Sequence, residues 1–553
     1  MSENIIIKYA IHPFNLYQKN YNLWKNIKLF FCISYLFSSI ILSNNIIKII
    51  KIKFKINLKY KEKIPNKNNK KITKKIYKNN IKNNSEELKI LIGKTLNCEN
   101  VLITERGLFQ NILITGTIGS GKTSSAMYPI TKQLIEFNFD NIKNKVGILM
   151  LDVKGNYYKY AKKIAFECNR NKDIVVIEIN GNNKYNPLDK PNLKASVLAN
   201  RVRVVMELFS GNTSESYWID KSEQIIAECI KLCRAYNKGY VNFSEIHNLV
   251  TNCEYYNSKI EKIRNLFLKG YYNKEECYNL ITAINFFEKE FLRLDQRTAS
   301  ILKSQITRIT STFMSDYAVS NTFNFSQNNF NSINLSQIIE EGKIVILNMN
   351  IAQYKNLSKI IAAFLKLDFQ AEVLSRLSSN YKNKERIVAF ISDEYQEYIT
   401  ENDADFYAQS REAKCINMVA TQSYTSLLKT LNNESVLRCI TQNLINKIWF
   451  RTDDIYTIEE AQKQIGREEK EKISKSISEN AKETRYSTIS GKLKAKDSNI
   501  SESVSSSYEK DYIYDIQFFT QELETFSAIA FLSDGNKVME PQKINLIPYF
   551  RKE

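Results

Sequence analysis

A chain of 553 residues with 43% hydrophobic and 25% charged residues has the composition of folded protein and is too long for one compact core, so we expect two or three globular units. The formal net charge of +20 is concentrated in residues 1–84, which hold 18 lysines, no arginine and two acidic residues. The rest has 61 basic and 57 acidic residues, so its net charge does not by itself indicate nucleic-acid binding. Nine cysteines without a CxxC pair and only two histidines disfavour a zinc site.

The N-terminal segment combines an apolar run with a lysine-rich stretch. Residues 29–42 (LFFCISYLFSSIIL) are uncharged, although a transmembrane helix needs about 20 residues. Residues 48–82 contain fourteen lysines and one glutamate, and lysines beside a span stay in the cytoplasm. We predict a single-pass membrane anchor over 1–47 and a juxtamembrane tether over 48–85, with the bulk of the chain cytoplasmic. A buried amphipathic or core helix is the alternative.

The stretch ILITGTIGSGKTSS contains the phosphate-loop motif GxxxxGK[ST]. It lies between a predicted strand (111–115) and a predicted helix (123–137), so loop amides and the helix N-terminus can hold phosphates. Lys122 would bridge the β- and γ-phosphates of ATP, and the Thr123 hydroxyl would hold Mg²⁺. The predicted nucleotide-binding residues are Gly116, Thr117, Ile118, Gly119, Ser120, Gly121, Lys122, Thr123 and Ser124.

Two later strands end in polar residues that suit nucleotide hydrolysis. In RIVAFISDEYQEY, Asp393 can orient the Mg²⁺ shell and Glu394 can polarise the attacking water. In CINMVATQSYTSL, Gln422 at a strand tip can contact the γ-phosphate, or it can belong to a simple strand-to-helix turn. Arg411, in AQSREAKC, reads from the sequence alone as a solvated helix charge.

Apolar runs alternate with helical segments, which predicts an α/β fold with a mostly parallel, doubly wound sheet. Catalytic groups then gather at the carboxyl ends of the strands. The further strand candidates are residues 147–152, 174–179, 344–347, 447–451 and 528–532. The pattern of residues 195–314 is helical, and the serine-rich residues 470–508 form either a polar hairpin or a disordered loop.

The set GTIGSGKT, LDVKGN, FISDE and ATQS, in this order, resembles the conjugative coupling proteins of type IV secretion systems (TraG/TraD-like). The resemblance runs from about Leu91 to Phe550. It implies a RecA-like P-loop motor with an inserted all-α domain, a homo-hexameric ring at the inner membrane, and ATP hydrolysis with Mg²⁺. The implied partners are DNA, a relaxase–DNA complex and components of the secretion channel.

The same resemblance implies residue roles. Lys122 and Thr123 bind nucleotide and Mg²⁺, Asp393 supports the metal, Glu394 activates water and Gln422 senses phosphate. Arg411 falls where the family places an arginine that reaches into the neighbouring subunit's ATP site. The chain departs from the family in having one candidate span where two are usual, and Asn156 where glutamate is common.

These considerations predict five segments. They are the anchor (1–47), the tether (48–85), the first part of the ATPase domain (86–194), the inserted all-α domain (195–335) and the second part of the ATPase domain (336–553). The expected function is membrane-anchored, ATP-driven transfer of DNA or relaxase–DNA into a secretion channel. Two alternatives are a chromosome-segregation type translocase of duplex DNA and a nucleotide-dependent docking receptor with little hydrolysis. Glu394 argues against the receptor, because a pure switch does not need a water-polarising carboxylate.

Overall fold

The structure is a computed structural model of the chain, which divides into two units, residues 1–86 and 87–553. It describes residues 25, 26, 29, 87–152, 154–209, 216–325, 332–378, 383–481, 484–486, 493–495 and 498–551. The predicted anchor and tether therefore lie outside the described residues, apart from residues 25, 26 and 29. No helix within the described part combines the length and apolar character that a membrane crossing requires.

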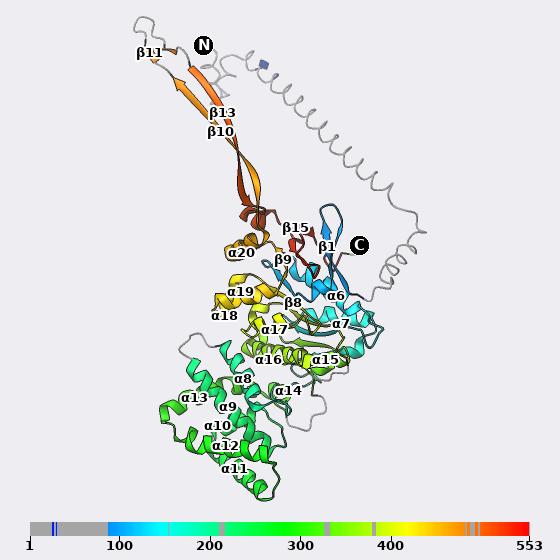
Figure 1. The fold of residues 1–553 in the computed structure, drawn as a ribbon, viewed down its shortest axis with the longest axis vertical. Helices are drawn as coiled ribbons and strands as arrows, with labels where there is room; N and C mark the ends of the chain where they lie inside the picture. The colour runs from blue at the N-terminus through cyan, green and yellow to red at the C-terminus, as the bar shows by residue number, and fades with distance from the viewer. Residues whose placement is uncertain are drawn as a thin grey trace. The chain divides into compact units, whose positions relative to one another are not determined.

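An eleven-stranded mixed sheet forms the frame of residues 87–553 (Figure 1). Seven neighbouring strands, β9 to β5 in the order below, are parallel, and four antiparallel strands extend one edge. In spatial order the strands are β2 (Asn100–Thr104), β1 (Lys89–Thr95), β15 (Gln542–Asn545), β14 (Ser527–Phe531), β9 (Asn446–Phe450), β3 (Ile112–Thr115), β8 (Cys415–Thr421), β7 (Val388–Ser392), β4 (Gly147–Asp152), β6 (Ile344–Asn348) and β5 (Ile174–Ile177). The predicted α/β class with a large, mostly parallel sheet is confirmed.

Helices cover both faces of this sheet. Alternate strand residues point to opposite faces, so Leu113 and Leu149 join one apolar core whereas Ile112 and Ile148 join the other. The helices around the sheet are α5 (Glu105–Leu108), α6 (Tyr128–Glu136), α7 (Tyr157–Glu167), α15 (Ser336–Glu340), α16 (Ile351–Ser378), α17 (Asp403–Gln409), α18 (Tyr424–Leu431), α19 (Glu434–Asn443) and α20 (Ile455–Ile465). Strands buried on both faces explain why the sequence shows continuous apolar runs in the parallel part.

From residue 195 on, the described part of the segment between β5 and β6 is mostly helical, as the periodicity of residues 195–314 predicted. It contains α8 (Ala195–Glu207), α9 (Ser216–Tyr236), α10 (Phe243–Thr251), α11 (Cys253–Leu268), α12 (Lys274–Lys289), α13 (Gln296–Thr310) and α14 (Tyr317–Phe323). Asparagine or aspartate side chains accept main-chain amides at the start of five of these helices, which satisfies donors that a helix leaves free. The apolar side chains of the segment join those of α16 and one sheet face in a single core.

The serine-rich segment forms a hairpin, which was one of its two predicted states. Strand β10 (Arg467–Ala481) pairs antiparallel with β13 (Ser498–Tyr512) from Arg467↔Tyr512 to Ala481↔Ser498. Short strands β11 (Thr484–Tyr486) and β12 (Leu493–Ala495) pair beyond them. Serine hydroxyls face one another across the ribbon, as in Ser474–Ser505 at 2.8 Å.

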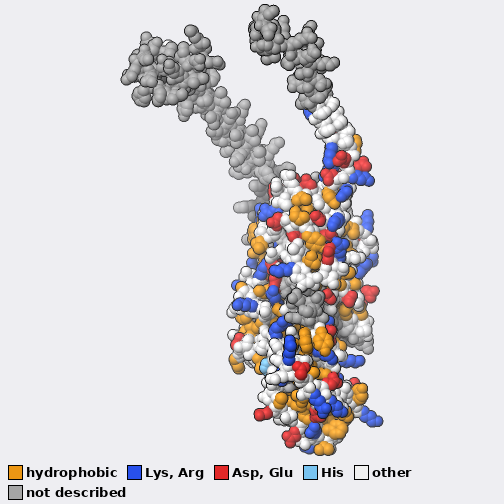
Figure 2. All heavy atoms as spheres, turned by 90° about the vertical axis from the view of Figure 1, so that its left-hand side faces the viewer, with side chains coloured by type: hydrophobic (Ala, Val, Ile, Leu, Met, Phe, Trp, Pro, Cys, Tyr) orange, Lys and Arg blue, Asp and Glu red, His pale blue; other side chains and the backbone are white. Residues whose placement is uncertain are grey.

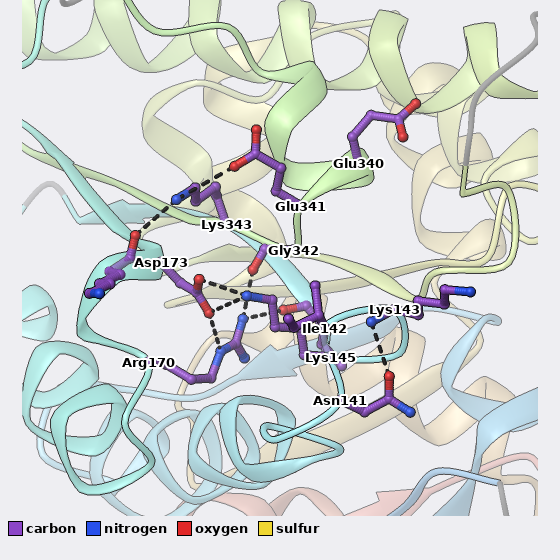
Figure 3. A network of polar contacts seen from close by, with 12 residues as sticks. Asn141, Ile142, Lys143, Lys145, Arg170, Asp173, Glu340, Glu341, Gly342 and Lys343 are labelled. Carbon is purple, nitrogen blue, oxygen red and sulfur yellow. Dashed lines mark hydrogen bonds and ion pairs between the residues drawn. The ribbon is translucent and has the colours of Figure 1, made fainter.

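A buried polar network holds the amino ends of β4, β5 and β6 together (Figure 3). Both Asp173 carboxylate oxygens accept from Lys145 Nζ at 2.7 Å, and Arg170 Nε donates to the same carboxylate at 3.0 Å. The Arg170 guanidinium also donates to the Val146 and Gly342 carbonyls at 2.8 and 2.7 Å. These groups bind one another and the main chain, so they stabilise the amino ends of the strands. The polar residues of the predicted site lie at the carboxyl ends.

Candidate active site

The loop after β3 has a backbone that requires glycine. Gly116, Gly119 and Gly121 have φ values of 154°, 80° and 102°, and a Cβ on Gly116 would lie 2.6 Å from Phe450 Cβ. A π-helical turn follows at Lys122–Met127 and continues into α6, where a regular helix was predicted. A glycine loop that leads into a helix N-terminus presents main-chain amides and a positive dipole to an anion.

The Lys122 side chain is buried within this loop. Its ammonium donates to the Gly116 carbonyl and, at 3.2 Å, to the Thr117 carbonyl. Burial lowers the pKa of Lys122, and the negative charges of Asp393 and Glu394 oppose this effect. The amine is therefore held at the loop and within the field of both acidic residues.

Thr123 and Asp393 meet although their strands are not neighbours. The Thr123 hydroxyl donates to Asp393 Oδ2 at 3.2 Å. Burial raises the pKa of Asp393, while Lys154 and Lys122 lower it. A hydroxyl and a carboxylate fit Mg²⁺, which uses one or two carboxylates together with substrate phosphates. Within the described residues there is no group of three or more His, Cys, Asp or Glu that could hold a metal ion.

Glu394 and Gln422 also come together. Gln422 Nε2 donates to Glu394 Oε2 at 3.3 Å, because β8 lies between β3 and β7 and ends at the same edge of the sheet. Gln396 Nε2 donates to the same carboxylate. The backbone of Glu394 has φ 56°, a left-handed conformation that is uncommon for a residue with a side chain and is concentrated at functional sites.

Lys154 is a site residue to which the sequence assigned no role. It follows β4, the neighbour of β7, and its ammonium pairs with Glu394 Oε1 and lies 3.4 Å from Asp393 Oδ2. Asp152 builds the turn that positions it, since Asp152 Oδ1 accepts the amides of Lys154 and Gly155 at 3.1 and 2.8 Å. The LDVKGN motif draws attention to Lys154 in the sequence. Its contact with the acidic residues depends on the strand order, which the sequence alone does not give.

Lys154 lowers the pKa of Glu394. Burial disfavours the charged form of Glu394, but the hydrogen bond and the charge of Lys154, together with the hydrogen bonds from Gln396 and Gln422, outweigh burial and hold the pKa of Glu394 below its ordinary value. The two carboxylates in turn outweigh the effect of burial on Lys154 and raise its pKa. Glu394 is thereby kept ionised, as a group that accepts a proton must be.

Replacement of Lys154 by methionine is expected to raise the pKa of Glu394, and so to move to higher pH the acid limb of the pH–rate profile of any hydrolysis in which Glu394 is the base. Without the ammonium, the two largest contributions that oppose burial are lost and the pKa of Glu394 rises, so the carboxylate becomes protonated at a higher pH than in the parent protein. The check is kcat/KM against pH, with Lys154→Arg as the charge-preserving control. An unchanged acid limb in Lys154→Met would contradict this role.

Arg411 lies apart from these residues. It is exposed, follows α17 and precedes β8, whereas Gln422 follows the other end of that strand. The seven residues of β8 span about 20 Å. Arg411 of one chain therefore lies at the amino ends of the parallel strands, whereas Glu394 of the same chain lies at their carboxyl ends.

Acidic and basic side chains are interspersed on the face shown in Figure 2, in keeping with the near-neutral body.

Comparison with known proteins agrees with this geometry. The family model described as Helicase HerA, central domain, matches residues 90–368, just over half of the chain, and the type IV secretion-system coupling protein DNA-binding domain matches residues 295–504. No curated protein matches at a significant level.

Similar solved structures include several of one coupling protein. The unbound bacterial conjugative coupling protein TrwBdeltaN70 has a TM-score of 0.54 at 10% identity, with 84% of this chain and 89% of that chain covered. TrwB in complex with ADP and Mg²⁺ has a TM-score of 0.54 at 10% identity, with 83% and 89% covered. TrwB in complex with the ATP analogue ADPNP has a TM-score of 0.51 at 11% identity, with 80% and 86% covered. The chain therefore belongs to the HerA-type P-loop ATPase family, and it resembles the TrwB-like coupling proteins of type IV secretion systems in its fold and over residues 295–504.

Proposed function

We propose that this protein hydrolyses ATP at the phosphate loop and uses the energy to transfer DNA or a relaxase–DNA complex into a type IV secretion channel. The observation that carries the proposal is the convergence of Thr123, Asp393, Glu394 and Gln422 at one edge of the sheet. A pure docking receptor does not need an ionised carboxylate beside the phosphate loop. The ADP–Mg²⁺ complex of TrwB supports the same ligands here.

Each residue has a defined task in this proposal. Lys122 contacts the β- and γ-phosphates, and Thr123 and Asp393 would hold Mg²⁺, which would supply positive charge to the phosphate oxygens. Glu394 orients the attacking water and accepts its proton. Gln422 contacts the water or the γ-phosphate and responds when the phosphate leaves.

The purified full-length protein tests this function directly. We expect ATP hydrolysis that increases with added DNA and with oligomer formation, since the proposed motor acts as a homo-hexameric ring. Lys122→Ala should reduce hydrolysis to background, because it removes the cation that the phosphates need. A folded preparation that neither binds Mg–ATP nor self-associates would refute the proposal.

The remaining parts of the proposal concern assembly and location. Residues 1–47 anchor the protein in the inner membrane as a single pass, and residues 48–85 tether the body on its cytoplasmic side. The family match of residues 295–504 supports DNA as the cargo. Deletion of residues 1–47 should release the protein from membranes, and retention would refute the anchor.

Arg411 acts in the neighbouring subunit's site in this proposal. Its position, exposed and far from Glu394 of the same chain, suits a contact between subunits. Arg411→Ala should lower hydrolysis. Mixed rings of Arg411→Ala and Lys122→Ala subunits should recover part of it, because some interfaces then combine an intact loop with an intact arginine. Intact mixed rings without any recovery would contradict action in trans.

A further inference from the structure

Three aromatic residues flanking the last strands lie at the phosphate loop. Phe526 precedes β14, and Tyr549 and Phe550 follow β15. The main-chain amide of Phe526 donates to the Ser120 carbonyl at 3.1 Å, and that of Tyr549 donates to the Ser124 carbonyl at 2.9 Å. The main chain at Phe526 is therefore hydrogen-bonded to the phosphate loop, and the main chain at Tyr549 is hydrogen-bonded to the first turn after the loop.

The rings form a surface that stays open to solvent. A Cβ on Gly121 would lie 2.6 Å from Phe526 Cδ1, so the ring occupies space that only a glycine leaves. The Phe550 ring centroid lies 6.0 Å from that of Phe526 and 5.4 Å from that of Tyr549. Tyr549 and Phe550 are nevertheless 49% and 58% exposed. Two exposed rings beside the partly buried Phe526 ring offer a flat apolar ligand a surface on which to pack.

The surface is also held in place. Tyr549 packs edge-on against Tyr128 and Tyr160 at centroid distances of 4.9 and 5.1 Å, and those two rings stack on each other at 4.4 Å. Phe526 has φ 69°, a left-handed backbone that a phenylalanine rarely adopts and that is concentrated at ligand clamps. The first feature positions the Tyr549 ring and the second the backbone of Phe526, and the Phe550 ring contacts both of these residues.

The direction in which a bound triphosphate runs along the loop indicates which part of the nucleotide lies at these rings. Lys122, Asp393 and Glu394 mark the γ-phosphate end, so the α-phosphate, ribose and base must continue past Thr123 towards Ser124. The main chain of Tyr549 lies there. We propose that Tyr549 and Phe550 stack on the base of the bound nucleoside triphosphate, with Phe526 closing this cradle at Gly121. The inference rests on the proposed nucleotide site and adds its base-binding part.

Stacking makes a distinct prediction about specificity. Every base presents a π-face, so an aromatic platform binds bases with little discrimination. ATP and GTP should therefore both bind more tightly than inorganic tripolyphosphate, which reaches only the phosphate loop. The difference between ATP and tripolyphosphate measures the contribution of the cradle.

Calorimetric titration of the full-length protein with Mg–ATP and with Mg–tripolyphosphate tests the proposal. Phe550→Ala and Tyr549→Ala should each raise the Kd for ATP about 10-fold, the usual size of a stacking loss, and leave the Kd for tripolyphosphate unchanged. Phe550→Trp should retain tight ATP binding. Tyr317→Ala, at an aromatic residue of the helical segment that is 84% exposed, should change neither value.

Other outcomes would overturn the proposal. Equal losses of ATP and tripolyphosphate binding would mean that the rings only support the loop, and unchanged ATP binding with lost single-stranded DNA binding would mean that they serve the cargo. A parent protein that binds tripolyphosphate as tightly as ATP would refute the cradle alone. A parent protein that binds neither would refute the nucleotide site and the cradle together.

Discussion

Replacement of Glu394 by glutamine is expected to lower the kcat of ATP hydrolysis about 10²–10⁴-fold while nucleotide binding is retained. Glutamine has nearly the same shape but cannot take a proton from the attacking water. The loop, Lys122 and the Thr123–Asp393 pair remain in place to bind Mg–ATP. The measurement is single-turnover hydrolysis together with ATP affinity.

Glu397 provides a matched control for this variant. It lies three residues further on and pairs with Lys359 of α16 at 2.6 Å. Glu397→Gln should therefore keep near-parent hydrolysis. In cells, Glu394→Gln should abolish DNA transfer without releasing the protein from membranes. Normal hydrolysis and transfer by Glu394→Gln would refute the motor and favour the docking receptor.

The parallel strands could be predicted because burial on both faces leaves a continuous apolar run in the sequence. Strand β1 and strand β15, by contrast, mix buried and exposed residues at the antiparallel edge, so neither was predicted. The serine-rich pattern of β10 and β13 was compatible with a hairpin and with a loop. These strands have few apolar side chains, so burial of apolar surface does not favour one state over the other. The helical pattern of residues 195–314 did not reveal that its core merges with one sheet face.

The site residues were predictable one at a time, since each follows an apolar strand. Their contacts were not, because they depend on strand order. Gln422 reaches Glu394 only because β8 lies between β3 and β7, and Lys154 reaches both acidic residues only because β4 is the other neighbour of β7. Parallel strands far apart in sequence can be ordered in many ways, and local patterns do not choose among them.

The loop that carries Glu394 is held by a buried ion pair, which leads to the second large expected effect. Lys366 of α16 and Asp403 of α17 are both fully buried, and Lys366 Nζ lies 2.6 Å from Asp403 Oδ2. The same ammonium donates to the Tyr398 carbonyl and the Thr400 hydroxyl at 2.7 and 2.9 Å. The Tyr395 hydroxyl donates to Asp403 at 2.5 Å, and Tyr395 directly follows Glu394.

Lys366→Met is expected to lower the free energy of unfolding by about 3–5 kcal/mol, because it leaves the Asp403 carboxylate buried without its cation. Burial lowers the pKa of Lys366 and Asp403 opposes this, so the pair is stable only as a unit. The double variant Lys366→Met/Asp403→Asn should recover much of the loss, since it removes the unpaired charge. Urea unfolding of the full-length protein and its variants measures both effects.

Lys359→Met is the matched control because Lys359 lies on the same helix and pairs with Glu397 at the same 2.6 Å separation, but with both side chains partly exposed. Water screens such a pair, so its loss should cost about 1 kcal/mol or less. Equal losses in the free energy of unfolding for Lys366→Met and Lys359→Met would show that burial does not determine how strongly the ion pair stabilises the protein. A larger cost at Lys366, accompanied by reduced hydrolysis in the folded variant, would show that stability and the placement of Glu394 depend on the same pair of charges.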